Sequence, residues 1–246
     1  SSYSTISGGY CNKTSNLGTD GSTIGGGRCN TISNYNTNST IGGGYINLIV
    51  ESSPFATIGG GCRNTIYIHS ASATIGGGQC NTISDYASNS TISGGCCNTT
   101  SVYNCNTTIG GGVCNMMSGG NSVIGGGTCN TTSSVSSTIG GGFQNTTSGY
   151  GNATISGGYK NIASGVYSTV SGGYCNTASG YYSTSSGGYC NLVLGCSSFI
   201  GGGRLNCLSG KVSFIGGGCC NTNSGYCGST IGGGVCNCTD SCYSFV

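Results

Sequence analysis

The side chains best suited to covalent chemistry in this sequence of 246 residues are 19 cysteines, beside one histidine and four carboxylates. General acid–base catalysis needs two titratable groups held close together. The four carboxylates instead lie far apart along the chain, at Asp20, Glu51, Asp85 and Asp240. The cysteine doublets 96–97 and 219–220 lack the paired spacing of a zinc site, and His69 stands alone. We therefore expect that the protein is not an enzyme and that it has neither a metal site nor a cofactor.

Composition excludes several other classes of protein. Only 4% of the residues are charged and the net charge is +2, so no basic patch exists that would neutralise the phosphates of a nucleic acid. No apolar run approaches the length of a membrane-spanning helix. Glycine is abundant, at 52 residues, yet there is one proline and no Gly-X-Y period, which excludes collagen. These features favour a structural protein.

A short repeat, S-T-I-G-G-G, covers the whole chain. With its Ile taken as position 0, the repeat occurs in fifteen copies, spaced first by 18 and 17 residues and later by 15 or 16. Positions +2 and +3 are glycine in every copy, and position +6 is asparagine in every copy. This period is too short for paired-helix repeats, and a Gly-Gly pair in each copy would weaken helices.

Two short strands and two turns per copy fit this period. One strand is S-T-I-G and the other N-T-x-S, and their alternation places positions −2, 0, +6 and +8 inside and the threonines at −1 and +7 outside. The sequence thus predicts an all-β fold, a parallel β-solenoid of about fifteen coils of 15–18 residues. It would form one domain over residues 1–246, with long coils over 1–108 and short coils over 109–246. Glycine at +10 of the short coils predicts a turn with positive φ.

Such coils bury little apolar surface, so polar contacts must stabilise them. The asparagines at +6 are predicted to form an inward ladder whose amides bond from coil to coil. The ladder comprises Asn12, Asn30, Asn47, Asn64, Asn81, Asn98, Asn115, Asn130, Asn145, Asn161, Asn176, Asn191, Asn206, Asn221 and Asn237.

Ten cysteines occupy position +5, on neighbouring coils. Stacked residues about 4.8 Å apart lie within reach of a disulfide, and many cysteines in a weakly cored chain indicate an oxidising, extracellular setting. We predict the pairs Cys11–Cys29, Cys80–Cys97, Cys114–Cys129, Cys175–Cys190 and Cys220–Cys236. The alternative is a column of buried free thiols that act as small hydrophobic side chains.

The nine N-x-S/T sequons fall into two groups according to their position in the repeat. Five belong to the inward +6 column, whereas four lie at −3 on the outer side. If a secretory route glycosylates the chain, we expect glycans at those four, Asn38, Asn89, Asn106 and Asn152. The alternative is that a chain rich in Ser, Thr and Asn contains sequons by chance.

The two ends carry pieces of the same strand. The chain begins with Tyr3, Ser4, Thr5 and Ile6, and it ends with Ser244, Phe245 and Val246, which falls at position 0 of a sixteenth coil. Uncapped solenoid ends expose backbone ladders. We expect either a longer array or subunits that stack head to tail at these residues.

The pattern N-x-A-S-G-x-Y-S-T-x-S-G-G, in Asn161–Gly173 and Asn176–Gly188, resembles the YadA-like head repeat of trimeric autotransporter adhesins. The resemblance implies a parallel β-roll, three-chain assembly and binding to host matrix. This chain departs from that family in its cysteines and in lacking a heptad stalk and a membrane anchor.

Three functions follow as hypotheses. The first is an extracellular structural protein, secreted or on a cell or virion surface, in which a disulfide-stapled solenoid stacks into a fibre and its main partner is itself. The second is an adhesin or receptor-binding shaft, for which the family resemblance implies a trimer. The third is an ice-binding protein that uses the outward threonine columns.

Overall fold

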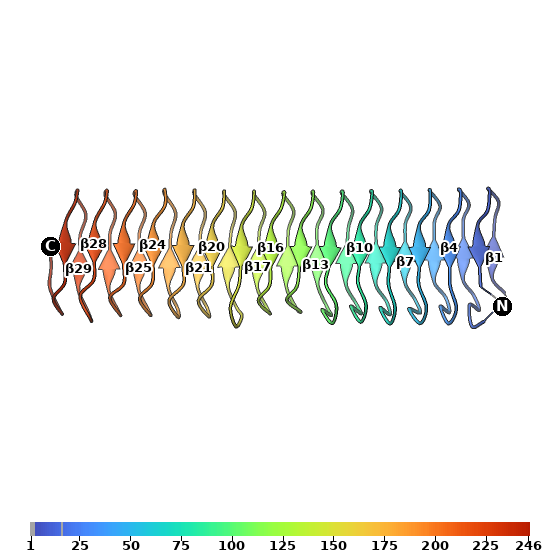
Figure 1. The fold of residues 1–246 in the computed structure, drawn as a ribbon, viewed down its shortest axis with the longest axis horizontal. Helices are drawn as coiled ribbons and strands as arrows, with labels where there is room; N and C mark the ends of the chain where they lie inside the picture. Colours follow the sequence, from blue (N-terminus) through green and yellow to red (C-terminus); the bar gives the residue numbers. More distant parts are fainter. Residues whose placement is uncertain (1–2, 16) are drawn as a thin grey trace. The chain divides into compact units, whose positions relative to one another are not determined.

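The structure of the protein is a computed structural model, and it describes residues 3–15 and 17–246. In these residues the chain forms a parallel β-solenoid of about 15 turns, with two sheets and no helix. Figure 1 shows each turn as one loop of the ribbon with a strand on either side. The predicted fold class is confirmed.

The chain divides into two compact units, Ser1–Cys129 and Asn130–Val246. The division falls among the short coils and not at residue 108, where the period changes. Each unit contains the same two sheets, one built from the S-T-I-G strands (the first sheet) and one from the N-T-x-S strands (the second sheet).

Every strand of the first unit is two residues long. Its first sheet contains β1 (Thr5–Ile6), β3 (Thr23–Ile24), β5 (Thr40–Ile41), β7 (Thr57–Ile58), β9 (Thr74–Ile75), β11 (Thr91–Ile92), β13 (Thr108–Ile109) and β15 (Val123–Ile124). Its second sheet contains β2 (Lys13–Thr14), β4 (Thr31–Ile32), β6 (Leu48–Ile49), β8 (Thr65–Ile66), β10 (Thr82–Ile83), β12 (Thr99–Thr100) and β14 (Met116–Met117).

The second unit repeats this arrangement. Its first sheet contains β17 (Thr138–Ile139), β19 (Thr154–Ile155), β21 (Thr169–Val170), β23 (Thr184–Ser185), β25 (Phe199–Ile200), β27 (Phe214–Ile215) and β29 (Thr230–Ile231). Its second sheet contains β16 (Thr131–Thr132), β18 (Thr146–Thr147), β20 (Ile162–Ala163), β22 (Thr177–Ala178), β24 (Leu192–Val193), β26 (Cys207–Leu208), β28 (Thr222–Asn223) and β30 (Cys238–Thr239).

Within each unit, equivalent positions of successive coils stack on one another. Thr57 pairs with Thr74 and Ile58 with Ile75 in parallel register. The same correspondence links Thr65 with Thr82 in the second sheet. A residue at a given position of the repeat therefore belongs to a column that follows the solenoid through its unit.

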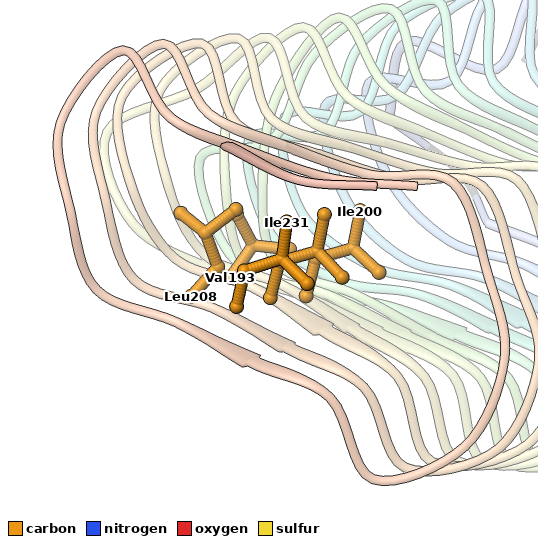
Figure 2. Close-up of a cluster of buried hydrophobic side chains, with 5 residues drawn as sticks. Val193, Ile200, Leu208 and Ile231 are labelled. Atoms are coloured by element: carbon orange, nitrogen blue, oxygen red, sulfur yellow. The ribbon is translucent and has the colours of Figure 1, made fainter. Parts of the chain in front are cut away.

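The alternation of buried and outward positions follows the sequence pattern. Ile58 and Ile66 are completely buried, whereas Thr57 and Thr65 beside them are partly exposed. Figure 2 shows the consequence in the second unit, where Val193 and Leu208 of the second sheet meet Ile200 and Ile231 of the first sheet in the interior. One inward residue per strand, apolar in most strands, thus supplies a narrow core between the sheets.

Both turns of each coil contain a residue in the left-handed conformation. Position +5 has φ between about 50° and 60° in the cysteine-bearing coils, as at Cys29, where φ is 58°. Position −3 behaves likewise, with φ of 55° at Asn38. Non-glycine residues adopt this conformation rarely, so its recurrence at the same two positions reflects the constraint of closing a short coil.

The prediction of a positive φ at +10 of the short coils was wrong for most of them. Gly165, Gly180, Gly195, Gly210 and Gly225 do not have positive φ. Glycine is needed there because successive coils approach too closely for a side chain. A Cβ added to Gly195 would lie 1.8 Å from the carbonyl oxygen of Gly210 in the next coil.

Candidate functional site

The asparagine side chains at +6 link each coil to its neighbours. The Asn64 backbone amide donates to Oδ1 of Asn47 at 3.0 Å, and the Asn81 amide donates to Oδ1 of Asn64 at 3.0 Å. Nδ2 of Asn64 donates to the carbonyl oxygens of Gly60 at 2.9 Å and Gly78 at 3.0 Å. The Asn64 side chain therefore ties its own coil to the following one, and the Asn64 backbone amide binds the asparagine side chain of the preceding coil.

This pattern recurs within both units. In the second unit, the Asn176 amide donates to Oδ1 of Asn161, and the Asn191 amide donates to Oδ1 of Asn176. All the asparagines of the column are buried except Asn12 and Asn237, which are half-buried. Buried amides require partners, and here the bends at positions +2 and +3 present glycine carbonyls to them.

Glycine at +3 is needed for this ladder to form. Gly61 has φ of 90°, and a Cβ added there would lie 2.1 Å from the carbonyl oxygen of Gly78 and 2.7 Å from Nδ2 of Asn64. A side chain at this position would displace the hydrogen-bonded groups. The Gly and Asn of the repeat thus form one structural unit.

The cysteines at +5 form columns on the outside of the turn. All 19 cysteines are free thiols in the structure, and each is exposed or half-buried. The alternative of buried thiols that pack as hydrophobic side chains is therefore wrong. The five predicted disulfide pairs stay predictions, and the stacking of their coils is consistent with them: the Cys129 amide donates at 2.9 Å to the carbonyl of Val113, the residue before Cys114.

Contacts between thiols change their acidity. Sγ of Cys96 and Sγ of Cys97 lie 3.3 Å apart. The hydrogen bond with Cys96, together with lost hydration and the nearby thiols of Cys114 and Cys80, raises the pKa of Cys97 to about 11. Lost hydration and the Cys175 thiol also raise the pKa of Cys190. These thiols are held protonated near neutral pH, which makes them slow nucleophiles.

The register separates the sequons as the alternation predicts. Asn38, Asn89, Asn106 and Asn152 are exposed and have φ between 55° and 57°. Among the sequons of the +6 column, Asn98, Asn130 and Asn145 are completely buried, and Asn12 and Asn237 are half-buried. Only the asparagines at −3 are accessible enough to be glycosylation candidates.

The predicted stacking residues lie on outermost coils of their units. The Thr5 amide donates to the Ser22 carbonyl at 2.9 Å, and Ser4 Oγ donates to the Thr19 carbonyl. Tyr3 is 92% exposed and Ile6 is 42% exposed, whereas position 0 of the next coil, Ile24, is fully buried. In the second unit, the Thr230 amide donates to the Ser244 carbonyl at 2.8 Å and the Val246 amide to the Thr230 carbonyl at 2.9 Å.

Aromatic side chains also form columns. Tyr159, Tyr174 and Tyr189 at +4 stack with ring centroids 4.8 and 4.9 Å apart and planes within 5° of parallel. The guanidinium of Arg28 lies between the rings of Tyr10 and Tyr45, at 5.5 and 5.7 Å. The recurrence of Tyr at +4 in the sequence indicates this stacking of rings, because equivalent positions of adjacent coils must lie side by side.

The described residues contain no pocket and no group of three or more His, Cys, Asp or Glu side chains placed to hold a metal ion. No helix in the described part of the chain is long and apolar enough to span a membrane. No family model and no curated protein matches this sequence.

Proposed function

We propose that this protein is an extracellular structural element, a β-solenoid whose copies add end to end to build a fibre. The observation that carries the proposal is the stacking of successive coils through hydrogen bonds that repeat in register within each unit. Backbone and asparagine hydrogen bonds repeat from coil to coil, yet Ile6 is 42% exposed where Ile24 is fully buried. A further coil placed on β1 would bury Ile6 and extend both sets of hydrogen bonds.

Adding a coil requires no new type of contact. Glycine at +2 and +3 and asparagine at +6 recur in every coil, so a coil from another copy would meet the hydrogen-bonding partners that an internal coil already has. Phe245 and Val246, at 81% and 46% exposure, would supply the corresponding surface in the second unit. Disulfides between stacked cysteines would strengthen such a fibre in an oxidising environment.

The test is electron microscopy of the non-reduced protein and of two lysine variants. We expect single-solenoid filaments from the unchanged chain and none from Ile6→Lys, because an inward charge at an open edge blocks further pairing. Thr5→Lys is the matched control, since it adds the same charge on the outward side of the same strand. Absence of filaments from the unchanged protein, or filaments that persist in Ile6→Lys, would rule out stacking on β1.

A second candidate, ice binding, is favoured by one column of the first unit. Thr5, Thr23, Thr40, Thr57, Thr74, Thr91 and Thr108 follow one another in register along the outer face of the first sheet. β-branching restricts χ1, so the hydroxyl and methyl groups repeat at about the 4.8 Å strand spacing. A thermal-hysteresis assay tests it: activity lost in Thr57→Lys and kept in Thr82→Lys, on the opposite sheet, is expected for this candidate.

A further inference from the structure

Apart from Lys13, the few charged residues of the first unit are divided between its two edges by the sign of their charge. One edge consists of the turns through +4 and +5, which have the same length in every coil, and the other consists of the longer turns through +10 to −3 (Figure 1). Arg28 and Arg63 lie on the first, which we call the basic edge. Asp20, Glu51 and Asp85 lie on the second, which we call the acidic edge.

The two cations of the basic edge lie two coils apart. Arg28 is exposed and its guanidinium is held between two tyrosine rings. Arg63 is exposed two coils further on, and its backbone amide donates to the Tyr45 carbonyl at 2.9 Å. Two coils correspond to roughly 10 Å along the solenoid.

Two carboxylates of the acidic edge have the same separation. Glu51 and Asp85 both occupy +10, two coils apart. Nδ2 of Asn34 donates to Oε1 of Glu51 at 3.1 Å, and the Ile68 amide donates to Oδ1 of Asp85 at 3.2 Å. These neutral donors orient the carboxylates without cancelling their charge. Asp20 lies on the coil two before that of Glu51.

We infer that the first unit is a lateral docking surface for a second copy of this chain, with the basic edge of one copy against the acidic edge of the other. The cations belong to the second and fourth coils and the carboxylates at +10 to the third and fifth. In two parallel copies displaced by one coil, Arg28 lies opposite Glu51 and Arg63 opposite Asp85. Edges of like charge repel each other, so the contact selects opposite edges.

The other charged groups do not provide a second such match. Lys13 lies on the outer face of the second sheet, in β2. The second unit has Lys160 and Arg204 at +5 and +4, but its turns between +9 and −3 carry one carboxylate, Asp240, and one cation, Lys211. The matched pairs of opposite charge therefore come from the first unit. This contact is independent of end-to-end addition, because it uses the sides of the coils.

The experiment reverses each edge separately and then mixes the variants. Arg28→Glu/Arg63→Glu makes both edges of the first unit acidic, and Glu51→Lys/Asp85→Lys makes both basic. Ile6→Lys is included in every chain to remove filament growth through β1. Sedimentation velocity at about 0.01 M salt, where the screening length is about 30 Å, measures self-association of single copies. Circular dichroism checks that each variant keeps the solenoid fold.

We expect the parent chain to self-associate, each variant alone to associate about tenfold more weakly, and a 1:1 mixture to recover the association. Association should also weaken in 0.15 M salt. Lys160→Glu/Arg204→Glu makes the same change of charge in the second unit and should behave like the parent. No association of the parent, association unaffected by either reversal, or a mixture that stays monomeric would overturn the inference. Failure of filament formation in the unchanged protein would leave this measurement intact.

Discussion

Replacing one asparagine of the ladder should destabilise the solenoid far more than replacing its outward neighbour. Asn64→Ala removes the two hydrogen bonds from Nδ2 to the Gly60 and Gly78 carbonyls. It also removes the Oδ1 acceptor of the buried Asn81 amide and of Asn81 Nδ2. Asn81 Nδ2 keeps its bonds to the carbonyls of Gly77 and Gly95, so the Asn81 backbone amide is the group left without a partner.

The expected loss of unfolding free energy is about 3–5 kcal/mol. Each Nδ2 bond contributes about 1 kcal/mol, and an unsatisfied buried amide costs about 1–3 kcal/mol. Thr65→Ala is the matched control, because Thr65 is the next residue, points outward and is partly exposed. Its replacement should cost at most about 1 kcal/mol, the span of strand propensities.

Equilibrium urea unfolding and amide hydrogen exchange together measure this difference. We expect exchange of the Asn81 amide to be accelerated about a hundredfold or more in Asn64→Ala, since each 1.4 kcal/mol corresponds to a factor of ten. Equal effects of Asn64→Ala and Thr65→Ala, or unchanged exchange at Asn81, would refute the view that the ladder stabilises the coils.

Four further predictions concern the same columns. In Asn64→Asp, burial should raise the pKa of the introduced carboxyl, so that stability present below its unfolded pKa of about 3.9 is lost as pH rises; a variant equally stable at acid and neutral pH would contradict this. Peptide mapping of non-reduced protein should recover the five predicted disulfides between cysteines at +5. Each should stabilise the folded chain by about 3 kcal/mol through loop closure, and random pairing would contradict the stacking argument. In the reduced protein, where Cys97 is a free thiol with its pKa raised from 9.0 to about 11, its thiolate fraction at pH 8 should be about a hundredfold lower than that of an ordinary cysteine, and Cys96→Ala should speed its alkylation. Glycopeptide mapping of protein made by a secretory pathway should find glycans at Asn38, Asn89, Asn106 or Asn152, and a glycan at Asn130 or Asn145 would contradict their burial.

The sequence by itself determined the coil and its faces. An invariant spacing of Ile, Gly-Gly and Asn placed Ile58 and Asn64 inside and Thr57 and Thr65 outside, as the structure has them. These predictions succeed because residues alternate between the two sides of a strand, so one inward residue assigns its neighbours. The repeat also puts equivalent residues on adjacent coils, from which columns of Asn, Thr and Cys follow.

The backbone of the turns and the partners of the side chains were decided only by the tertiary structure. Glycine at +10 was read as a sign of positive φ, whereas Gly195 is required because the Gly210 carbonyl approaches it at the next coil. The left-handed residues lie at +5 and −3, where cysteine and tyrosine give no local signal and only the asparagines and glycines at −3 favour this conformation. The distance between coils imposes these constraints, and it comes from hydrogen bonds between residues of adjacent coils. A turn motif taken alone does not contain that distance.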